Sequence, residues 1–159
     1  MSLYRFIASD NPLAEVDNSG FIQLKVRDIK KMESVPLPPA NLQSWDEIDD
    51  EATVLYAKDE SNLGGLRISL CENPPYDLEH YIEKKYIYWL EGNFLSTFID
   101  QLVDYVKLNV HANDHVELWA IWFGDGIKSK TIKSVQLNEI SIEDFEVLLN
   151  HECCCLKFI

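Results

Sequence analysis

The run from Val116 to Phe123 narrows the range of possible folds more than any other part of this chain. Its residues are apolar at both odd and even positions, with Glu117 as the one charged member. Alternate side chains of a β-strand point to opposite faces of a sheet. A strand that is apolar on both faces is typical of a central position in a sheet, and we predict that position for this run.

The residues after Gly92 have the periodicity of an amphipathic helix. Asn93 is a residue type that caps helices, and apolar residues then recur at the three- and four-residue spacing of one helical face. The apolar stripe consists of Phe94, Leu95, Phe98, Ile99, Leu102, Val103 and Val106, and the polar side carries Thr97, Asp100, Gln101 and Asp104. The pattern predicts a helix over this segment.

From Lys85 onward the predicted elements follow the order β-α-β-β-α-β. The expected strands are Lys85–Glu91, Val116–Phe123, Thr131–Leu137 and Cys153–Phe158. A Gly124-Asp125-Gly126 turn predicts that the second and third strands are antiparallel partners. The second helix opens at Ser141 and Asp144, which resemble a capping box, and runs to about Asn150.

This order is that of the ferredoxin-like fold, in which two helices cover one face of a four-stranded sheet. We therefore expect an α+β fold with a mostly antiparallel sheet and two main helices. The N-terminal strands are expected to extend that sheet or to form a second layer. The whole chain, residues 1–159, is predicted to be one domain, with a β-rich part over about 1–75 and an α+β part over about 85–159.

The N-terminal strands are expected at Leu3–Ala8, Phe21–Arg27, Thr53–Lys58 and Leu66–Cys71, the last two as a hairpin. In the second of them, Ile22, Leu24 and Val26 alternate with polar residues, which predicts that these three side chains face inward.

Two further signals lie between these strands. Three prolines within residues 35–40 remove backbone donors and predict an extended connector. Ser44-Trp45-Asp46-Glu47 then matches a capping box, which predicts a short acidic helix at about 45–51.

The charge balance sets the classes of partner. The chain has 27 Asp and Glu against 14 Lys and Arg, a formal net charge of −13. Nucleic acids and anionic lipids bind through cationic side chains, so we expect neither nucleic-acid nor membrane binding. Such a surface steers basic partners toward it, although it also serves solubility alone.

The densest acidic group is Asp46, Glu47, Asp49, Asp50 and Glu51. We predict it as a docking surface for a basic protein partner, against the alternative of a solvated helix face. A tight run of like charges beside a proline-rich connector is a poor source of catalytic carboxylates, because these need environments that separate their pKa values.

Two groups could bind a metal or act as nucleophiles. His111, Asp114 and His115 fall within five residues, but a metal site needs three or four converging groups. On a strand, His151, Cys153 and Cys155 would share one face and Cys154 the other. Free cysteine is most often buried as a small hydrophobe, so core packing is predicted for the cysteines and a polar helix end for the histidines.

The remaining signals indicate structure rather than chemistry. Gly124-Asp125-Gly126-Ile127-Lys128-Ser129 lacks the spacing of a phosphate-binding loop and predicts a turn. Core packing is also the predicted role of the aromatic residues Tyr86, Tyr88, Trp89, Trp119 and Trp122, although ligand stacking is open to them. The sequence carries no signature of a cofactor.

Compartment and function follow as expectations. Residues 1–15 lack the residue order of a signal peptide, and consecutive cysteines are no disulfide framework, so a cytoplasmic location is expected. We predict a non-enzymatic acidic binding protein, for example an immunity-type inhibitor of a basic toxin. The alternatives are an enzyme or small-ligand-binding protein whose pocket is assembled from dispersed residues, and a homo-oligomer formed through an edge strand.

Overall fold

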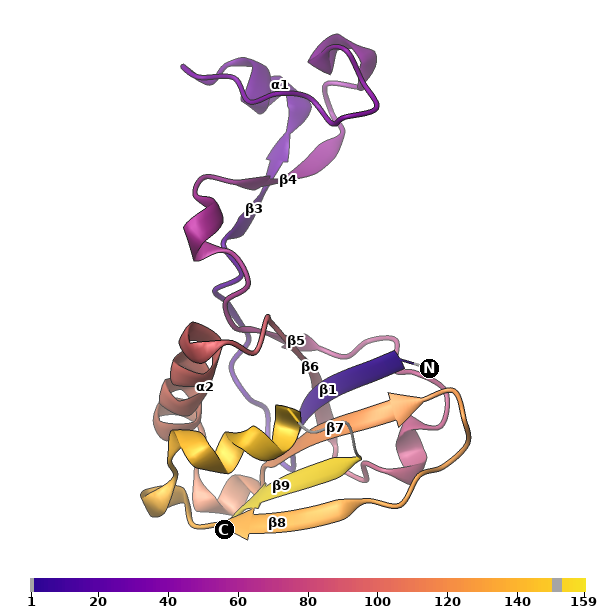
Figure 1. The fold of residues 1–159 in the computed structure, drawn as a ribbon, viewed down its shortest axis with the longest axis vertical. Coiled ribbons are helices and arrows are strands. Elements are labelled where there is room, and N and C mark those ends of the chain that lie inside the picture. The colour runs from indigo at the N-terminus through magenta and orange to yellow at the C-terminus, as the bar shows by residue number, and fades with distance from the viewer. Residues whose placement is uncertain (1, 150–152) are drawn as a thin grey trace. The chain divides into compact units, whose positions relative to one another are not determined.

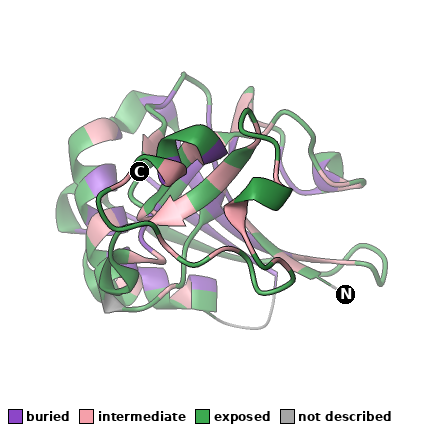
Figure 2. Ribbon diagram, turned by 90° about the horizontal axis from the view of Figure 1, so that it is seen from above, coloured by how far each residue is buried: buried purple, intermediate pink, exposed green. Residues whose placement is uncertain are grey.

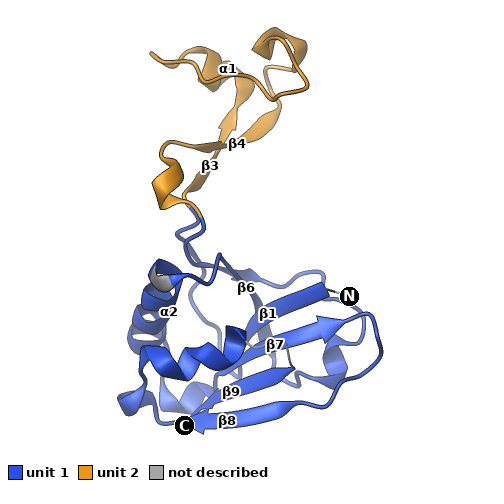
Figure 3. Cartoon of the chain, viewed as in Figure 1, with its two compact units in different colours: residues 1–19, 64–159 blue, residues 20–63 orange. Residues whose placement is uncertain are grey.

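The computed structural model of the chain describes residues 2–149 and 153–159. These residues group into two compact units, one of residues 1–19 with 64–159 and one of residues 20–63 (Figure 3). We call them unit 1 and unit 2. Unit 2 is an insertion within the β-rich N-terminal part expected over residues 1–75, and the single domain 1–159 stays a prediction.

The fold is mixed α+β and is dominated by sheet, as expected (Figure 1). The strands are β1 (Ser2–Ser9), β2 (Val16–Asp17), β3 (Phe21–Lys25), β4 (Thr53–Ala57), β5 (Arg67–Leu70), β6 (Tyr86–Glu91), β7 (Glu117–Phe123), β8 (Thr131–Val135) and β9 (Cys154–Phe158). The α-helices are α1 (Val26–Lys30) and α2 (Ser96–Asn109). Short 3-10 helices are η1 (Trp45–Glu47), η2 (Glu60–Asn62), η3 (Leu78–His80), η4 (Ala112–Asp114), η5 (Leu137–Glu139) and the longer η6 (Ile142–Leu149).

Unit 1 is built on a seven-stranded mixed sheet with the order β2-β5-β6-β1-β7-β9-β8. The ferredoxin-like order is not confirmed, because β1 lies between β6 and β7 and pairs antiparallel with both. The sequence of β1 explains this place: Phe6, Ile7, Ala8 and Ser9 are all fully buried. An N-terminal strand that is buried on both faces belongs inside the sheet rather than at its edge.

The central position predicted for the apolar run ending at Phe123 is confirmed. β7 pairs with β1 on one side and β9 on the other. Its side chains feed two separate cores: Leu118 and Ala120 join the core beneath α2 and η6, whereas Trp119 and Ile121 join a core on the opposite face. Buried residues accordingly gather along the central strands, and exposed residues dominate the loops (Figure 2).

Both predicted hairpins are wrong. β8 pairs with β9 in parallel rather than with β7, because β9 is almost entirely buried and takes the inner place, leaving β8, four of whose five residues are exposed, at the edge. β4 pairs with β3, and β5 pairs with β2 and β6. The turn residues in the sequence therefore predict where these strands end, but they do not predict which strands pair.

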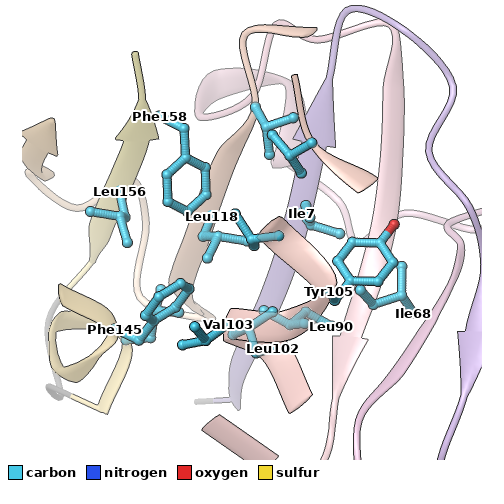
Figure 4. Close-up of a cluster of buried hydrophobic side chains, with 14 of the residues drawn as sticks. Ile7, Ile68, Leu90, Leu102, Val103, Tyr105, Leu118, Phe145, Leu156 and Phe158 are labelled. Atoms are coloured by element: carbon cyan, nitrogen blue, oxygen red, sulfur yellow. The ribbon is translucent and has the colours of Figure 1, made fainter. Parts of the chain in front are cut away.

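Helix α2 confirms the amphipathic pattern. Phe98, Ile99, Leu102, Val103 and Val106 are buried, whereas Leu95 is exposed. Side chains of α2, η6 and the central strands point toward one another in the larger core (Figure 4). The second helix is the 3-10 helix η6 rather than an α-helix, and its predicted end at Asn150 lies outside the described residues.

Unit 2 contains the two-stranded sheet β3-β4, α1 and η1. The strand predicted to reach Arg27 ends at Lys25, where α1 begins, and Ile22 is exposed instead of facing inward. The capping box at Ser44 and Glu47 is present, but it opens the single 3-10 turn η1 rather than a helix over 45–51. Val26 and Ile29 of α1 are the buried hydrophobic residues of this unit.

A matched pair of leucines on α2 tests the packing of unit 1. Leu102 is fully buried and Leu108 is 77% exposed. Leu102→Ala is expected to lower the free energy of unfolding by about 2–5 kcal/mol through lost burial and a residual cavity. Leu108→Ala makes the same change in helix propensity and should stay within about 0.5 kcal/mol. Urea unfolding measures both, and equal losses would contradict the helix face described here.

Candidate functional site

The predicted docking residues, here called the acidic segment (Asp46, Glu47, Asp49, Asp50 and Glu51), are exposed in unit 2. The structure brings three of them to cations from β3 and α1. Lys30 Nζ lies 2.8 Å from Asp46 Oδ1 and 2.6 Å from Asp50 Oδ1. The carboxylate of Glu51 pairs with both Lys25 and Arg27. The segment is therefore held against a neighbouring basic strand and helix.

The other two carboxylates of the acidic segment bind backbone amides. Glu47 Oε1 accepts hydrogen bonds from the amides of Gln43 and Ser44, at 2.7 and 2.9 Å. Asp49 Oδ1 accepts one from the amide of Glu51, at 2.8 Å. Every carboxylate of the segment thus has a partner inside unit 2, and five negative charges face three positive ones.

Two of these contacts favour the ionised form of a carboxyl group. The hydrogen bond from Lys30 holds the pKa of Asp46 below its ordinary value, and the same pairing raises the pKa of Lys30. The hydrogen bond from Lys25 likewise lowers the pKa of Glu51. A carboxyl group with a lowered pKa keeps its charge to a lower pH, so Asp46 and Glu51 stay negatively charged to a lower pH than free carboxyl groups do.

The histidine group predicted at the end of α2 is not brought together. Asp114 Oδ2 accepts the amide of His111 and its Oδ1 accepts Asn11 Nδ2, at 2.8 and 3.0 Å. His115 points to another carboxylate, with Nδ1 2.9 Å from Asp10 Oδ2. The prediction of a polar helix end for these residues fits this region better than a metal site does, because Asp114 is part of the 3-10 turn η4 and caps it.

A different set could hold a metal. Within the described ranges, Asp77, Glu79 and His80 place one ligand atom each within 4.8 Å of the others. One imidazole and two carboxylates form a ligand set that divalent metals accept. The three residues belong to one turn at η3, where Asp77 Oδ1 lies 3.5 Å from His80 Nε2, so a local pairing already accounts for their proximity. The i, i+2, i+3 spacing of Asp77, Glu79 and His80 is the one signal of this set in the sequence.

The cysteines pack in the core, as predicted. Cys153, Cys154 and Cys155 are all buried, and all four cysteines of the chain are free. Cys153 and Cys155 join one core and Cys154 the other, which is the alternation of a strand. Burial, with Glu117 nearby, raises the pKa of Cys155 to about 12. His151, their predicted neighbour, lies outside the described residues.

The glycine turn and the aromatic residues also have structural roles. The chain bends at 124–126 and continues into strand β8, so no helix follows the turn as a phosphate loop requires. Tyr88 and Trp119 are buried, with Tyr88 Oη accepting the amide of Leu13 and Trp119 Nε1 donating to Glu117. Trp89 differs, because it lines a cavity.

That cavity, of about 340 Å³, was not predicted. Its lining comes from β1, β6 and the segment that follows β6: Leu3, Tyr4, Arg5, Trp89, Leu90, Glu91, Gly92 and Phe94. A second cavity of about 300 Å³ lies beside η3 and the turn after β7, next to Tyr81 and Phe123. Both cavities are assembled from residues far apart in the sequence, which is why no local sequence motif predicts them.

The chain was compared with family models, curated proteins and solved structures, and none of the three comparisons gives a match. Among the described residues, no helix has the length and apolar character needed to cross a membrane. The geometry of the acidic segment and of the cavities therefore carries the functional argument.

The pairing of Lys30 is open to a direct test. Lys30→Met removes both the hydrogen bond and the positive charge beside Asp46, so the pKa of Asp46 should rise toward its ordinary value. Asp59 is the internal control, because its pKa is lowered by hydrogen bonds from Ser61 and not by Lys30. NMR titration of the carboxyl carbons reads both groups, and an unchanged Asp46 would refute the pairing.

The cysteines provide a second test. A thiol with a pKa of about 12 is ionised to about one part in ten thousand at pH 8, and the thiolate is the form that reacts. Iodoacetamide should therefore leave Cys155 unlabelled in the folded protein, and burial should keep the reagent from Cys153 and Cys154 as well. Cys71, which is only partly buried, should be labelled slowly. Mass spectrometry identifies the sites, and urea should expose all four. Rapid labelling of the β9 thiols in the native state would point to a reactive site instead.

Proposed function

We propose that this chain is a non-enzymatic binding protein that engages a basic protein partner through the acidic segment. The observation that carries the proposal is the fixing of the segment by Lys25, Arg27 and Lys30. Charges held in place before binding lose less conformational freedom when a partner arrives. Five carboxylates against three cations leave an excess of negative charge for that partner.

The rest of the chain supports the same partner class over a longer range. Residues 20–63 carry nine Asp and Glu against five Lys and Arg, and the remaining residues carry the larger share of the net charge of −13. A field of one sign raises the rate at which oppositely charged proteins meet, while close pairs at the contact fix the orientation. The whole surface thus attracts a basic partner and the acidic segment receives it.

Exposed apolar side chains elsewhere in unit 2 add possible contact area. Phe21, Ile22 and Leu55 of the β3-β4 sheet are exposed by 42, 52 and 66%. Apolar and aromatic groups form the centre of protein interfaces, with charged groups around them. This combination suits an inhibitor that covers a basic surface, and an immunity-type inhibitor of a basic toxin is the concrete form of the proposal.

The location that fits this function is the cytoplasm. Four free thiols, three of them buried in the core, persist in a reducing compartment. Self-association is the competing arrangement, because β8 is an edge strand of the large sheet and exposes Ile132. Light scattering over a range of concentrations separates the two, since a binding protein of the proposed kind stays monomeric without its partner.

A charge-neutral variant tests the acidic segment without dismantling it. Asp46→Asn/Asp49→Asn/Asp50→Asn keeps an acceptor oxygen for Lys30 and for the amide of Glu51 while removing three charges. Asp100→Asn/Asp104→Asn/Asp125→Asn, in unit 1, is the control with the same change in net charge. Wild type and both variants are used as baits in a lysate of the native cell. A specific partner is retained by wild type and control and is lost by the acidic-segment variant.

The recovered partner then gives the decisive rates. Removing contact charges is expected to slow association at low salt by about tenfold or more and to flatten its salt dependence, as read by stopped-flow or surface binding. Equal rates for the two triple variants would move the interface away from the acidic segment. A partner whose association is indifferent to salt would refute the electrostatic proposal altogether.

A further inference from the structure

The cavity of about 340 Å³ lies where two neighbouring strands of the large sheet diverge. β1 and β6 pair from Phe6 with Trp89 to Ser9 with Tyr86. The residues of β1 that precede Phe6 pair with β7 but not with β6. Likewise, Leu90 and Glu91 of β6 pair with β5 but not with β1. The cavity is lined by these separated ends and by Gly92 and Phe94. The cavity therefore lies between two stretches of strand backbone, one from β1 and one from β6, that do not pair with each other.

Arg5 is the cationic group of this cavity. It is half-buried, its Nε donates to the carbonyl of Leu148 at 3.0 Å, and its guanidinium lies 3.8 Å above the ring of Phe94. No carboxylate of the described residues lies within ion-pair distance of it, although the chain has 27 Asp and Glu. The bond to Leu148 uses the Nε–H, which is one of the five in-plane donors of the guanidinium.

The other walls are mostly apolar. Leu3, Leu90 and Phe94 lie on the face of the sheet that carries Arg5, and Phe94 covers Arg5. The rings of Tyr4 and Trp89 lie 5.7 Å apart on the opposite face. Glu91 is the acidic residue of the lining, and its carboxylate lies 3.5 Å from Arg67 of the neighbouring strand, which offsets its charge. The lining thus combines one guanidinium with apolar surfaces. Ligand cavities typically combine a mostly apolar lining with a few polar groups that fix the ligand's orientation.

We propose that this cavity binds a small organic anion in which a carboxylate or phosphate is joined to an apolar group. The anionic group pairs with the Arg5 fork, which matches the geometry of both anions. The apolar group packs beside Leu3, Leu90 and Phe94, on the same face of the sheet as Arg5. The volume fits a ligand of this size, because cavities for small molecules begin at about 300 Å³. This site lies within unit 1 and does not depend on the protein-binding function proposed above.

Titration with three small probes tests the chemistry. Benzoate and phenyl phosphate carry a ring and an anion, and benzamide is the neutral probe of the same shape. Benzoate should give saturable shifts in amide NMR signals, centred on Leu90, Gly92 and Phe94, with benzamide binding at least tenfold more weakly. Comparison of benzoate with phenyl phosphate tells which anion is preferred. Equal binding of benzoate and benzamide, shifts that map elsewhere, or no saturable shift with any probe at millimolar concentration would overturn the proposal.

Variants assign the anion contact. Arg5→Gln should weaken benzoate binding at least tenfold while leaving benzamide unchanged, and Arg5→Lys should fall between, because it keeps the charge but loses the fork. Arg27→Gln, in unit 2, is the control with the same change in net charge and should bind as wild type does. Equal benzoate affinity of Arg5→Gln and Arg27→Gln would overturn the assignment. If Arg5→Gln proves unfolded by circular dichroism, the comparison of benzoate with benzamide on the wild-type chain still decides.

The two proposals fail independently. Asp46→Asn/Asp49→Asn/Asp50→Asn should bind benzoate like the wild type, since the acidic segment belongs to unit 2. Conversely, loss of benzoate binding in Arg5→Gln leaves the capture of a basic protein partner unaffected.

Discussion

The constraint on which the rest of unit 1 depends is the burial of β1 and β7 on both faces. Strands that are apolar on both sides demand cover above and below the sheet. α2 and η6 supply one cover, and the segment around Leu78, Tyr81 and Ile82 supplies the other. Odd and even residues of β9 follow the same division, which is why three consecutive cysteines can all be buried without pairing. The positions of β1, β9 and the short helices then follow from the need to complete two cores.

This constraint also explains how far the sequence could predict the fold. Element type was readable because it is set locally: the stripe of α2 and the runs in β6, β7 and β9 lie where their patterns indicate. Strand partners were not readable, since they depend on which strands are most apolar across the whole chain. The buried strand β1 lies between β6 and β7. The buried strand β9, and not β8, is the neighbour of β7. Adjacent turns favour hairpins, but burial decided the neighbours.

The candidate sites divide in the same way. The acidic segment is contiguous, so its residues could be found from composition alone, but its cations come from β3 and α1, some twenty residues earlier, and only the pairing of β3 with β4 brings them near. The cavity at Arg5 is built from two segments more than eighty residues apart in the sequence, 3–5 and 89–94. Its one sequence signal was a lone arginine within an apolar strand, where Phe6 and Ile7 follow immediately. A charged residue in such a place is either solvated at the end of the strand or paired with something else.

The two proposed sites place opposite demands on the electrostatics of the chain. A net charge of −13 attracts a basic protein to the acidic segment, and added salt weakens that attraction by screening it. The same field repels a small anion that approaches Arg5, so moderate salt removes a barrier there while the short-range, half-buried contact with the guanidinium is screened less. Arg5 is one of only three arginines in an acidic chain. Binding at the cavity should therefore be tolerant of salt where binding at the acidic segment is sensitive to it, and this contrast separates local recognition from long-range attraction within one molecule.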